Sequence, residues 1–234
     1  MSLGLGIGSG IGLGIGVIAL LVAGLVTSEL KRARKGSVVF KPLASIGFLA
    51  LAVAMGALEA GNTYGHLIMA GLVLSFFGDV FLLASDRPAL FLAGLASFLL
   101  GHVAYAIGFL VQGVAAPATI AMAVALVPVA LLVWRWLKPH LPADMVAAVV
   151  AYIVVISSME ALATGATFEA GFDWAGGGPL MLLGATMFWI SDLAVARRQF
   201  VDDSPSSAIW GLPLYYGGQV LLALSVLVGL PAAA

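Results

Sequence analysis

Long apolar stretches, separated by short polar connections, run along nearly the whole chain of 234 residues. A helix needs roughly 20 mostly apolar residues to cross a bilayer. The sequence predicts about eight such spans, at residues 4–27, 42–60, 63–84, 88–111, 116–137, 143–164, 178–197 and 207–230. Because the apolar stretches are continuous and do not alternate with polar residues, they favour helices over the strands of a membrane barrel. We therefore expect an all-α, polytopic membrane protein that forms a single transmembrane helical domain over residues 1–234.

The positions of the basic residues predict how the chain is oriented. All ten lie in the connections that follow odd-numbered spans: Lys31, Arg32, Arg34, Lys35, Lys41, Arg87, Arg135, Lys138, Arg197 and Arg198. Cytoplasmic loops of membrane proteins carry an excess of Lys and Arg. We therefore expect these connections in the cytoplasm and both termini on the exoplasmic side of a bacterial cytoplasmic (inner) membrane.

Composition excludes several classes of function. The chain is 62% hydrophobic and 9% charged, whereas a soluble domain carries about 25% charged residues. It has no cysteine, which excludes disulfides, thiolate metal sites and a cysteine nucleophile. The few basic residues are too scattered for a nucleic-acid partner. The histidines do not cluster at metal-ligand spacing, and we expect neither a metal nor an organic cofactor.

Two aspartates lie inside apolar stretches, which is where an ionisable group is costly. Asp79 lies in LVLSFFGDVFLL, and Asp192 follows Ser191 in MLLGATMFWISDLAV. Such a group costs roughly 2.5–3.5 kcal/mol at the centre of a bilayer and defaults to a functional role. Ser75, four residues before Asp79, shares its helix face. The alternative is a solvated helix end, or a carboxylate paired with a loop arginine such as Arg198.

Other polar residues within the spans could complete a site. His102 lies near the middle of the span 88–111, and Tyr105 shares its face. A lone histidine in a span either hydrogen-bonds a neighbouring helix or handles substrate or protons. Tyr215, Tyr216 and Gln219 in the last span are polar enough to line a cavity, and Tyr215 and Gln219, four residues apart, share a helix face.

Two further charged residues lie near predicted span ends. Lys41 precedes Pro42, which suits the first turn of a helix because its missing N–H costs nothing there. The lysine either reaches the interface as an anchor or faces an anionic lipid headgroup. Glu160 is expected near the exoplasmic end of the span 143–164, away from the aspartates, where it can reach the interface.

In their order along the chain, these features resemble the YhhN family of membrane proteins, the lysoplasmalogenases. The motifs that carry the resemblance are Lys41-Pro42-Leu43, Gly78 to Leu82, Phe91 to Tyr105, Tyr152 to Ala161, and Phe188 to Ala194. The resemblance extends from Lys41 to Gln219 and leaves out the glycine-rich first span.

The resemblance implies a hydrolase that cleaves the vinyl ether bond of lysoplasmalogens and releases a fatty aldehyde and a glycerophospho-alcohol. Vinyl ethers hydrolyse by protonation of the β-carbon, which gives an oxocarbenium ion that water captures. This chemistry requires an acid and a carboxylate but no covalent nucleophile. Asp79 and Asp192 would be the catalytic pair, one protonated and one ionised. His102 and Tyr105 would orient a carboxylate or the water.

The implied substrate is a lysophospholipid or another ether lipid, taken from the bilayer. Lys41 would meet its phosphate, and the side chains of Ser75, Ser191, Tyr215 and Gln219 would line its cavity. The alternative function is a proton-coupled transporter of small molecules or lipids, because buried Asp and His residues also form proton relays. No convincing internal repeat of the kind found in transporters accompanies these residues. A structural membrane subunit, in which the aspartates only pack, is the third class.

Overall fold

The expected spans are present as helices. The computed structural model describes residues 2–171 and 177–229, with side chains from residue 10 onward. Its long helices are α1 (Ser2–Leu30), α2 (Arg34–Ala54), α3 (Thr63–Leu82), α4 (Pro88–Val111), α5 (Ala116–Leu137), α6 (Val146–Ala170), α7 (Gly178–Ala196) and α8 (Ser207–Ser225). Over the described residues there are 8 helices long and apolar enough to cross a membrane and no strand, so the all-α, polytopic prediction is confirmed.

Short helical turns extend or connect four of these helices. Two 3₁₀ turns, η1 (Lys138–His140) and η2 (Ala143–Met145), lie between α5 and α6. A π-helical turn, η3 (Arg197–Val201), continues α7, and a 3₁₀ turn, η4 (Val226–Gly229), continues α8. Turns of the π type often mark functional positions, and η3 carries two arginines at one end of the bundle.

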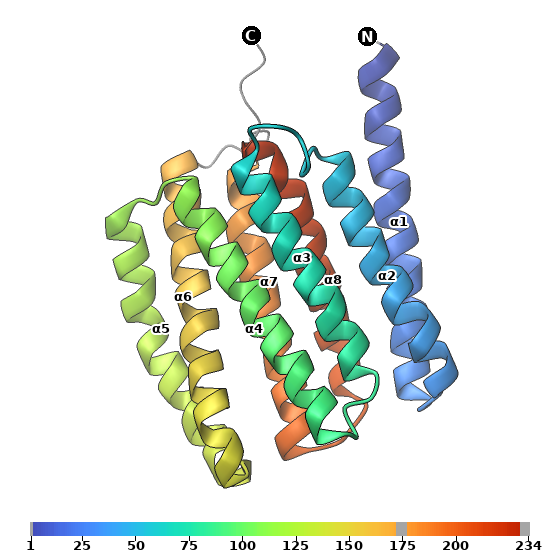
Figure 1. Cartoon of the computed structure of the whole chain (residues 1–234), viewed down its shortest axis with the longest axis vertical. Helices are drawn as coiled ribbons and strands as arrows, with labels where there is room; N and C mark the ends of the chain where they lie inside the picture. The colour runs from blue at the N-terminus through green and yellow to red at the C-terminus, as the bar shows by residue number, and fades with distance from the viewer. Residues whose placement is uncertain (1, 172–176, 230–234) are drawn as a thin grey trace.

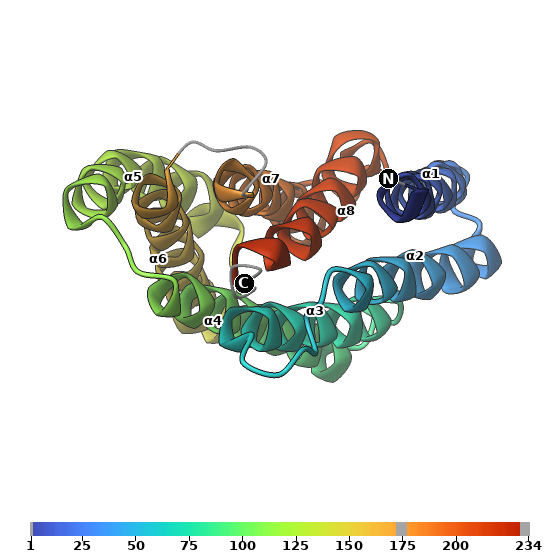
Figure 2. The ribbon, with the colours of Figure 1, turned by 90° about the horizontal axis from the view of Figure 1, so that it is seen from above.

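The helices form an up-and-down bundle in which neighbours along the chain pack side by side (Figure 1). Viewed from above, α8 lies between α7 and α1 and also packs against α2 and α3, whereas α5 lies at the edge beside α6 (Figure 2). α7 and α8 approach closely at two glycines, since a Cβ on Gly218 would lie 2.8 Å from the carbonyl oxygen of Gly184. Small residues permit such close helix contacts in membranes.

One end of the bundle carries the four connections that follow the odd-numbered helices and that contain, or lie next to, the basic residues. The connections α1–α2, α3–α4, α5–α6 and α7–α8 lie together at the bottom of Figure 1, opposite the start of α1. We call this the basic end. Its placement in the cytoplasm stays a prediction, as does the bacterial inner membrane. The expectation that all ten basic residues lie in connections is wrong for four of them, because Arg34, Lys35 and Lys41 lie in α2 and Arg135 lies in the last turn of α5.

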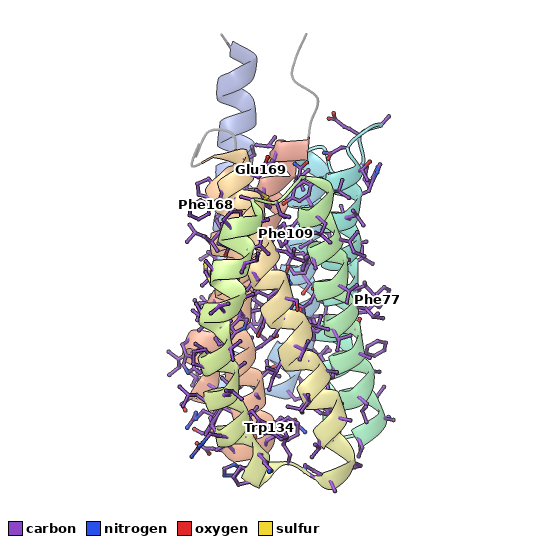
Figure 3. All side chains as sticks on the ribbon, turned by 90° about the vertical axis from the view of Figure 1, so that its left-hand side faces the viewer. Phe77, Phe109, Trp134, Phe168 and Glu169 are labelled. Atoms are coloured by element: carbon purple, nitrogen blue, oxygen red, sulfur yellow. The ribbon has the colours of Figure 1, made fainter. Side chains whose placement is uncertain are left out.

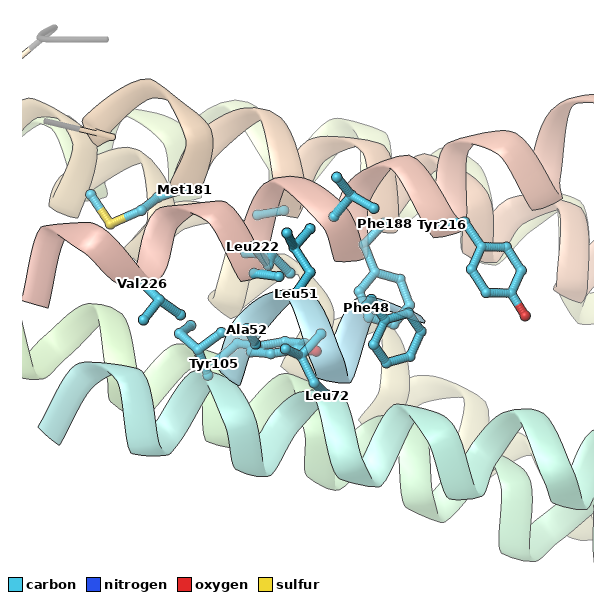
Figure 4. Packing of buried hydrophobic residues seen from close by; sticks show 14 of the residues in the cluster. Phe48, Leu51, Ala52, Leu72, Tyr105, Met181, Phe188, Tyr216, Leu222 and Val226 are labelled. Atoms are coloured by element: carbon cyan, nitrogen blue, oxygen red, sulfur yellow. The ribbon is translucent and has the colours of Figure 1, made fainter. Parts of the chain in front are cut away.

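The bundle is apolar on its outside as well as in its core. Side chains such as Phe77, which is 46% exposed, project from the outer surface (Figure 3). Inside, buried side chains of α2, α3, α4, α7 and α8 meet, among them Phe48, Leu72, Phe188 and Leu222 (Figure 4). A helical bundle that is apolar all round is typical of membrane spans.

The predicted limits of α2 are wrong. The helix begins at Arg34 rather than at residue 42 and ends at Ala54 rather than at 60, so Pro42 lies inside it and not in its first turn. A helix satisfies its own backbone hydrogen bonds in water or lipid and therefore continues past the apolar segment. Pro42 removes one backbone donor, and nearby the Ser45 hydroxyl lies 3.0 Å from the carbonyl oxygen of Lys41.

Candidate active site

A cavity of about 460 Å³ opens at the basic end of the bundle. Residues of α1, α2, α3, α4, α7 and α8 line it, and residues of the α1–α2, α3–α4 and α7–α8 connections surround its mouth. We call it the polar cavity. Five of the predicted site residues line it: Lys41, Asp79, Ser191, Asp192 and Tyr215. Asp79 near the end of α3 and Asp192 on α7 therefore face one shared space.

Asp79 is surrounded by groups that stabilise a carboxylate. Its side chain is 3% exposed, and the Nζ atom of Lys41 lies 3.6 Å from its Oδ1 atom. Ser45 and Tyr215 donate hydrogen bonds to its Oδ2 atom, at 2.7 and 2.8 Å, and the hydroxyl of Tyr216 lies 3.4 Å away. A buried charge is tolerated when it is both paired and hydrogen-bonded. These donors come from α2 and α8, so Asp79 joins three helices.

Asp192 has a sparser environment on the other side of the polar cavity. The hydroxyl of Tyr152 on α6 donates a hydrogen bond to its Oδ2 atom at 2.7 Å. The Nε2 atom of His102 on α4 lies 3.6 Å from the same oxygen, which is too far for a direct hydrogen bond. No lysine or arginine forms an ion pair with Asp192 among the described residues, and its side chain is 15% exposed. The two aspartates thus differ in their partners.

Aromatic rings connect the surroundings of the two aspartates. The Phe188 ring packs against the ring of His102 at 4.4 Å and against that of Tyr215 at 5.3 Å between centroids. Phe98, which lines the polar cavity, packs edge-on against Tyr215 at 5.8 Å and Phe188 at 6.1 Å. The partner of Asp79 and the neighbour of Asp192 are therefore held by one packed aromatic cluster.

His102 is fully buried, and neither ring nitrogen makes a hydrogen bond of normal geometry. The ring lies near the backbone of Phe98, one helical turn earlier, and near Asp192. A buried nitrogen without a partner is uncommon and calls for an explanation such as a water or a catalytic role. His102 does not line the polar cavity itself, but it lies 3.6 Å from Asp192, which does.

Three predicted site residues form a separate buried network. Tyr105 donates a hydrogen bond to the Oε1 atom of Gln219 at 2.7 Å, and its hydroxyl lies 3.5 Å from that of Ser75. All three side chains are fully buried and none lines the polar cavity. The network links α3, α4 and α8 behind the cavity wall. A substrate contact by these residues stays a prediction.

Cationic side chains surround the mouth of the polar cavity. Arg198 pairs with Glu29 and Asp203, and Arg32 pairs with Asp203. Arg34 also lines the mouth. Among the described cations that line this cavity, Arg34 is the one for which no acidic partner is present.

Sequence reasoning missed two partners of the aspartates, namely Ser45 and Tyr152. Ser45 follows Lys41 by four residues and so shares its helix face, which was a usable signal. Tyr152 belongs to a motif of the family resemblance, but nothing in its own segment indicates that it reaches Asp192. Contacts between helices that are far apart along the chain leave no pattern in the sequence.

Glu160 is also placed differently from its expectation. α6 continues to Ala170, so Glu160 lies well inside the helix and is 4% exposed instead of reaching the interface. Thr186 on α7 donates a hydrogen bond to its Oε1 atom at 2.6 Å, and its Oε2 atom has no hydrogen-bond partner.

Over the described residues, no group of three or more His, Asp or Glu side chains is arranged to hold a metal ion.

Comparison with known proteins agrees with the resemblance seen in the motifs. The model of the YhhN family matches residues 36–226. The relatives include lysoplasmalogenase TMEM86B of Sus scrofa, 30% identical over 179 residues that cover 76% of this chain and 71% of the relative. Lysoplasmalogenase TMEM86A of Homo sapiens is 32% identical over 184 residues, which cover 79% of this chain and 74% of the relative. No solved structure matches the chain.

Proposed function

The chain belongs to the YhhN family, and we propose that it is a membrane-embedded hydrolase that cleaves lysoplasmalogens. The products are a fatty aldehyde and a glycerophospho-alcohol. Relatives named lysoplasmalogenase, about 30% identical over most of the chain, support the substrate class. The observation that carries the proposal is that Asp79 and Asp192 line one cavity, because this reaction needs an acid and a carboxylate together.

The reaction balances with water as the only co-reactant. An acid protonates the β-carbon of the vinyl ether, and the positive charge is shared between the ether oxygen and the α-carbon. Water adds to the α-carbon and loses a proton, which gives a hemiacetal. The hemiacetal collapses to the aldehyde, and the glycerophospho-alcohol departs with its oxygen protonated. A properly placed acid contributes roughly 10²–10⁴-fold to such a rate.

We assign the acid to Asp192 and the ionised carboxylate to Asp79. The lysine and the hydroxyl donors around Asp79 favour its charged form. Asp192 has one hydroxyl donor and no lysine or arginine partner among the described residues, so a proton on its free oxygen is not opposed by a neighbouring cation. Two carboxylates in different surroundings can divide the acid and electrostatic roles in this way.

His102 and Tyr152 would act as positioning residues for Asp192. Tyr152 holds one carboxylate oxygen, which leaves the other oxygen for the substrate. His102 lies 3.6 Å from the held oxygen and retains two unused ring nitrogens. A water bridging His102 and Asp192 would be placed to restore the proton after each turnover.

The headgroup phosphate would bind at the mouth of the polar cavity. Arg34 lines this mouth without an acidic partner, and a guanidinium forms paired hydrogen bonds with phosphate. Lys41, the residue predicted to meet the phosphate, lies 3.6 Å from Asp79 instead. Arg34 is therefore the stronger candidate for binding the phosphate, and Lys41 is assigned to stabilising the carboxylate of Asp79.

The test measures aldehyde release from lysoplasmalogen by the purified chain. Asp192→Asn is expected to lower turnover by roughly 10²–10⁴-fold, and Asp79→Asn by a comparable factor. Asp144→Asn is the matched control, because Asp144 is exposed and lies outside the polar cavity. If the wild type releases no aldehyde, the hydrolase is excluded and the transporter alternative gains support. If both variants keep full turnover, the assignment of the aspartates is wrong.

An isotope experiment tests the chemical step. In D₂O, protonation of the β-carbon places one deuterium on the carbon next to the aldehyde carbonyl, which mass spectrometry detects. A saturated alkyl-ether lysolipid has no carbon to protonate and should remain intact. Aldehyde without deuterium at this position would contradict the mechanism while leaving the substrate class unaffected.

A further inference from the structure

A second, smaller cavity of about 80 Å³ adjoins the polar cavity. Its lining comes from α3, α4, α5, α6, α7 and η3 and is almost entirely apolar, with Leu95, Val133, Leu137, Val149 and Ile153 among its members. We call it the apolar groove. It extends to α5, the helix at the edge of the bundle (Figure 2), where the bundle meets the surrounding lipid.

The two cavities meet at Asp192. Six residues line both of them: Leu82, Phe91, Phe98, Asp192, Val195 and Gln199. Asp192 is the one acidic or basic side chain in this shared set. On one side of its carboxylate lies a space surrounded by charged residues, and on the other lies a space surrounded by hydrocarbon.

A lysoplasmalogen has the same order of parts along its length. A charged headgroup and glycerol stand at one end, a hydrocarbon chain at the other, and the vinyl ether joins the two. We propose that the apolar groove binds the carbons of the alkenyl chain that follow the vinyl ether and thereby holds the vinyl ether against Asp192, an inference that rests on the proposed function. Ile153 and Val133 are then specificity-determining residues that contact the chain.

The outer wall of the groove comes from α5, the helix at the edge of the bundle, and from α6. A lipid chain inside the membrane gains nothing from leaving water, so its recognition depends on packing against a shaped surface. Leu137 and Val133 supply that surface from α5, and Ile153 and Val149 supply it from α6. In this proposal, a chain bound against these helices lies on the other side of Asp192 from the charged mouth.

The experiment fills the groove and compares substrates. Ile153→Trp places a large ring in the groove, whereas Val154→Trp places the same ring on the outer face, where Val154 is 58% exposed. Ile153→Trp is expected to lower kcat/KM about tenfold on a sixteen-carbon alkenyl chain and to change it less than twofold on a two-carbon vinyl group, which has no carbon beyond the double bond. Val154→Trp should match the wild type on both. Equal losses on both chains, or no loss on either, would overturn the chain site.

A binding measurement separates this inference from the hydrolase itself. An alkyl-ether lysophosphocholine with a diazirine in its chain cannot be hydrolysed, and light attaches it to the residues that it contacts. Labelling is expected on peptides that contain Val133 and Ile153, and it should be lost in Ile153→Trp but kept in Val154→Trp. If the groove is labelled but no aldehyde forms, the chain site stands and the hydrolase fails. If aldehyde forms but the groove is never labelled, the chain site alone fails.

Discussion

Lys41 and Asp79 form an ion pair in which both side chains are largely withdrawn from solvent, with 3.6 Å between Nζ and Oδ1. Removal of one partner from such a pair leaves an uncompensated buried charge, which costs about 3–5 kcal/mol. We expect Lys41→Met to lower the thermal unfolding midpoint in detergent markedly. The double variant Lys41→Met/Asp79→Leu should recover much of this loss, because no unpaired charge remains.

The control for this prediction is Lys35→Met, since Lys35 is exposed near the start of the same helix. It should unfold like the wild type. If Lys41→Met also unfolds like the wild type, Asp79 is protonated in the folded protein, and the assignment of the ionised carboxylate must be reversed.

Tyr152 is expected to affect turnover more than substrate binding. Tyr152→Phe removes the hydroxyl that holds Asp192, and a lost hydrogen bond to a carboxyl group costs on the order of 1.5 kcal/mol. We predict a fall of about tenfold in kcat with little change in KM. Steady-state aldehyde release measures both constants.

Tyr64→Phe is the matched control for Tyr152→Phe. Tyr64 is also buried, but its hydroxyl is hydrogen-bonded to that of Ser225 and lies outside the polar cavity. The control should lose some stability and keep its kcat. An equal fall of kcat in both variants would show that Tyr152 acts only through stability.

Gly78 must lack a side chain because Phe98 occupies the space beside it. A Cβ at residue 78 would lie 2.6 Å from the ring of Phe98, and overpacking of this kind costs about 1–3 kcal/mol. Phe98 lines both the polar cavity and the apolar groove, so its displacement should also reduce activity. Gly78→Ala is therefore expected to lower the unfolding midpoint and aldehyde release together.

Gly14→Ala provides the comparison, because a Cβ there would meet nothing within 4 Å. Alanine is the better helix former, and this variant should unfold no earlier than the wild type and keep full turnover. Full activity of Gly78→Ala would mean that the ring of Phe98 can move without consequence for the site.

The orientation of the chain is open to direct measurement because the chain has no cysteine. Thr63→Cys and His140→Cys each introduce one thiol at an exposed position, at opposite ends of the bundle. In sealed cells that express the chain, an impermeant maleimide should label Thr63→Cys at once and His140→Cys only after permeabilisation. The reverse pattern would place the basic end outside.

Hydropathy predicted the helices well where the local sequence marks their limits. The spans 88–111 and 116–137 coincide with α4 and α5, because a proline in the first turn fixes where each helix begins. The start of α2 was wrong, since Arg34 and Lys35 extend the helix beyond its apolar part. Hydropathy reports where a helix lies in lipid, and helices do not end at that boundary.

Only those residues of the candidate site that stand out on their own in the sequence could be predicted. Asp79 and Asp192 stand out because each interrupts an apolar stretch. Their hydrogen-bond partners Ser45 and Tyr152 are 34 and 40 positions away along the chain, and their contacts depend on how separate helices pack. The shared cavity likewise depends on this packing, as does the burial of Glu160.

α5 lies at the edge of the bundle and contributes to the apolar groove but not to the surroundings of the two aspartates. This helix packs mainly against α6, and no residue bonded to Asp79 or Asp192 belongs to it. It nevertheless supplies one wall of the apolar groove. A tilt of α5 would widen or narrow the groove and leave both carboxylates in place. Under the proposed function and chain site, substitutions on α5 would alter the groove without replacing any residue bonded to Asp79 or Asp192, so preference for one hydrocarbon chain over another could diverge between relatives while the proposed chemistry is kept.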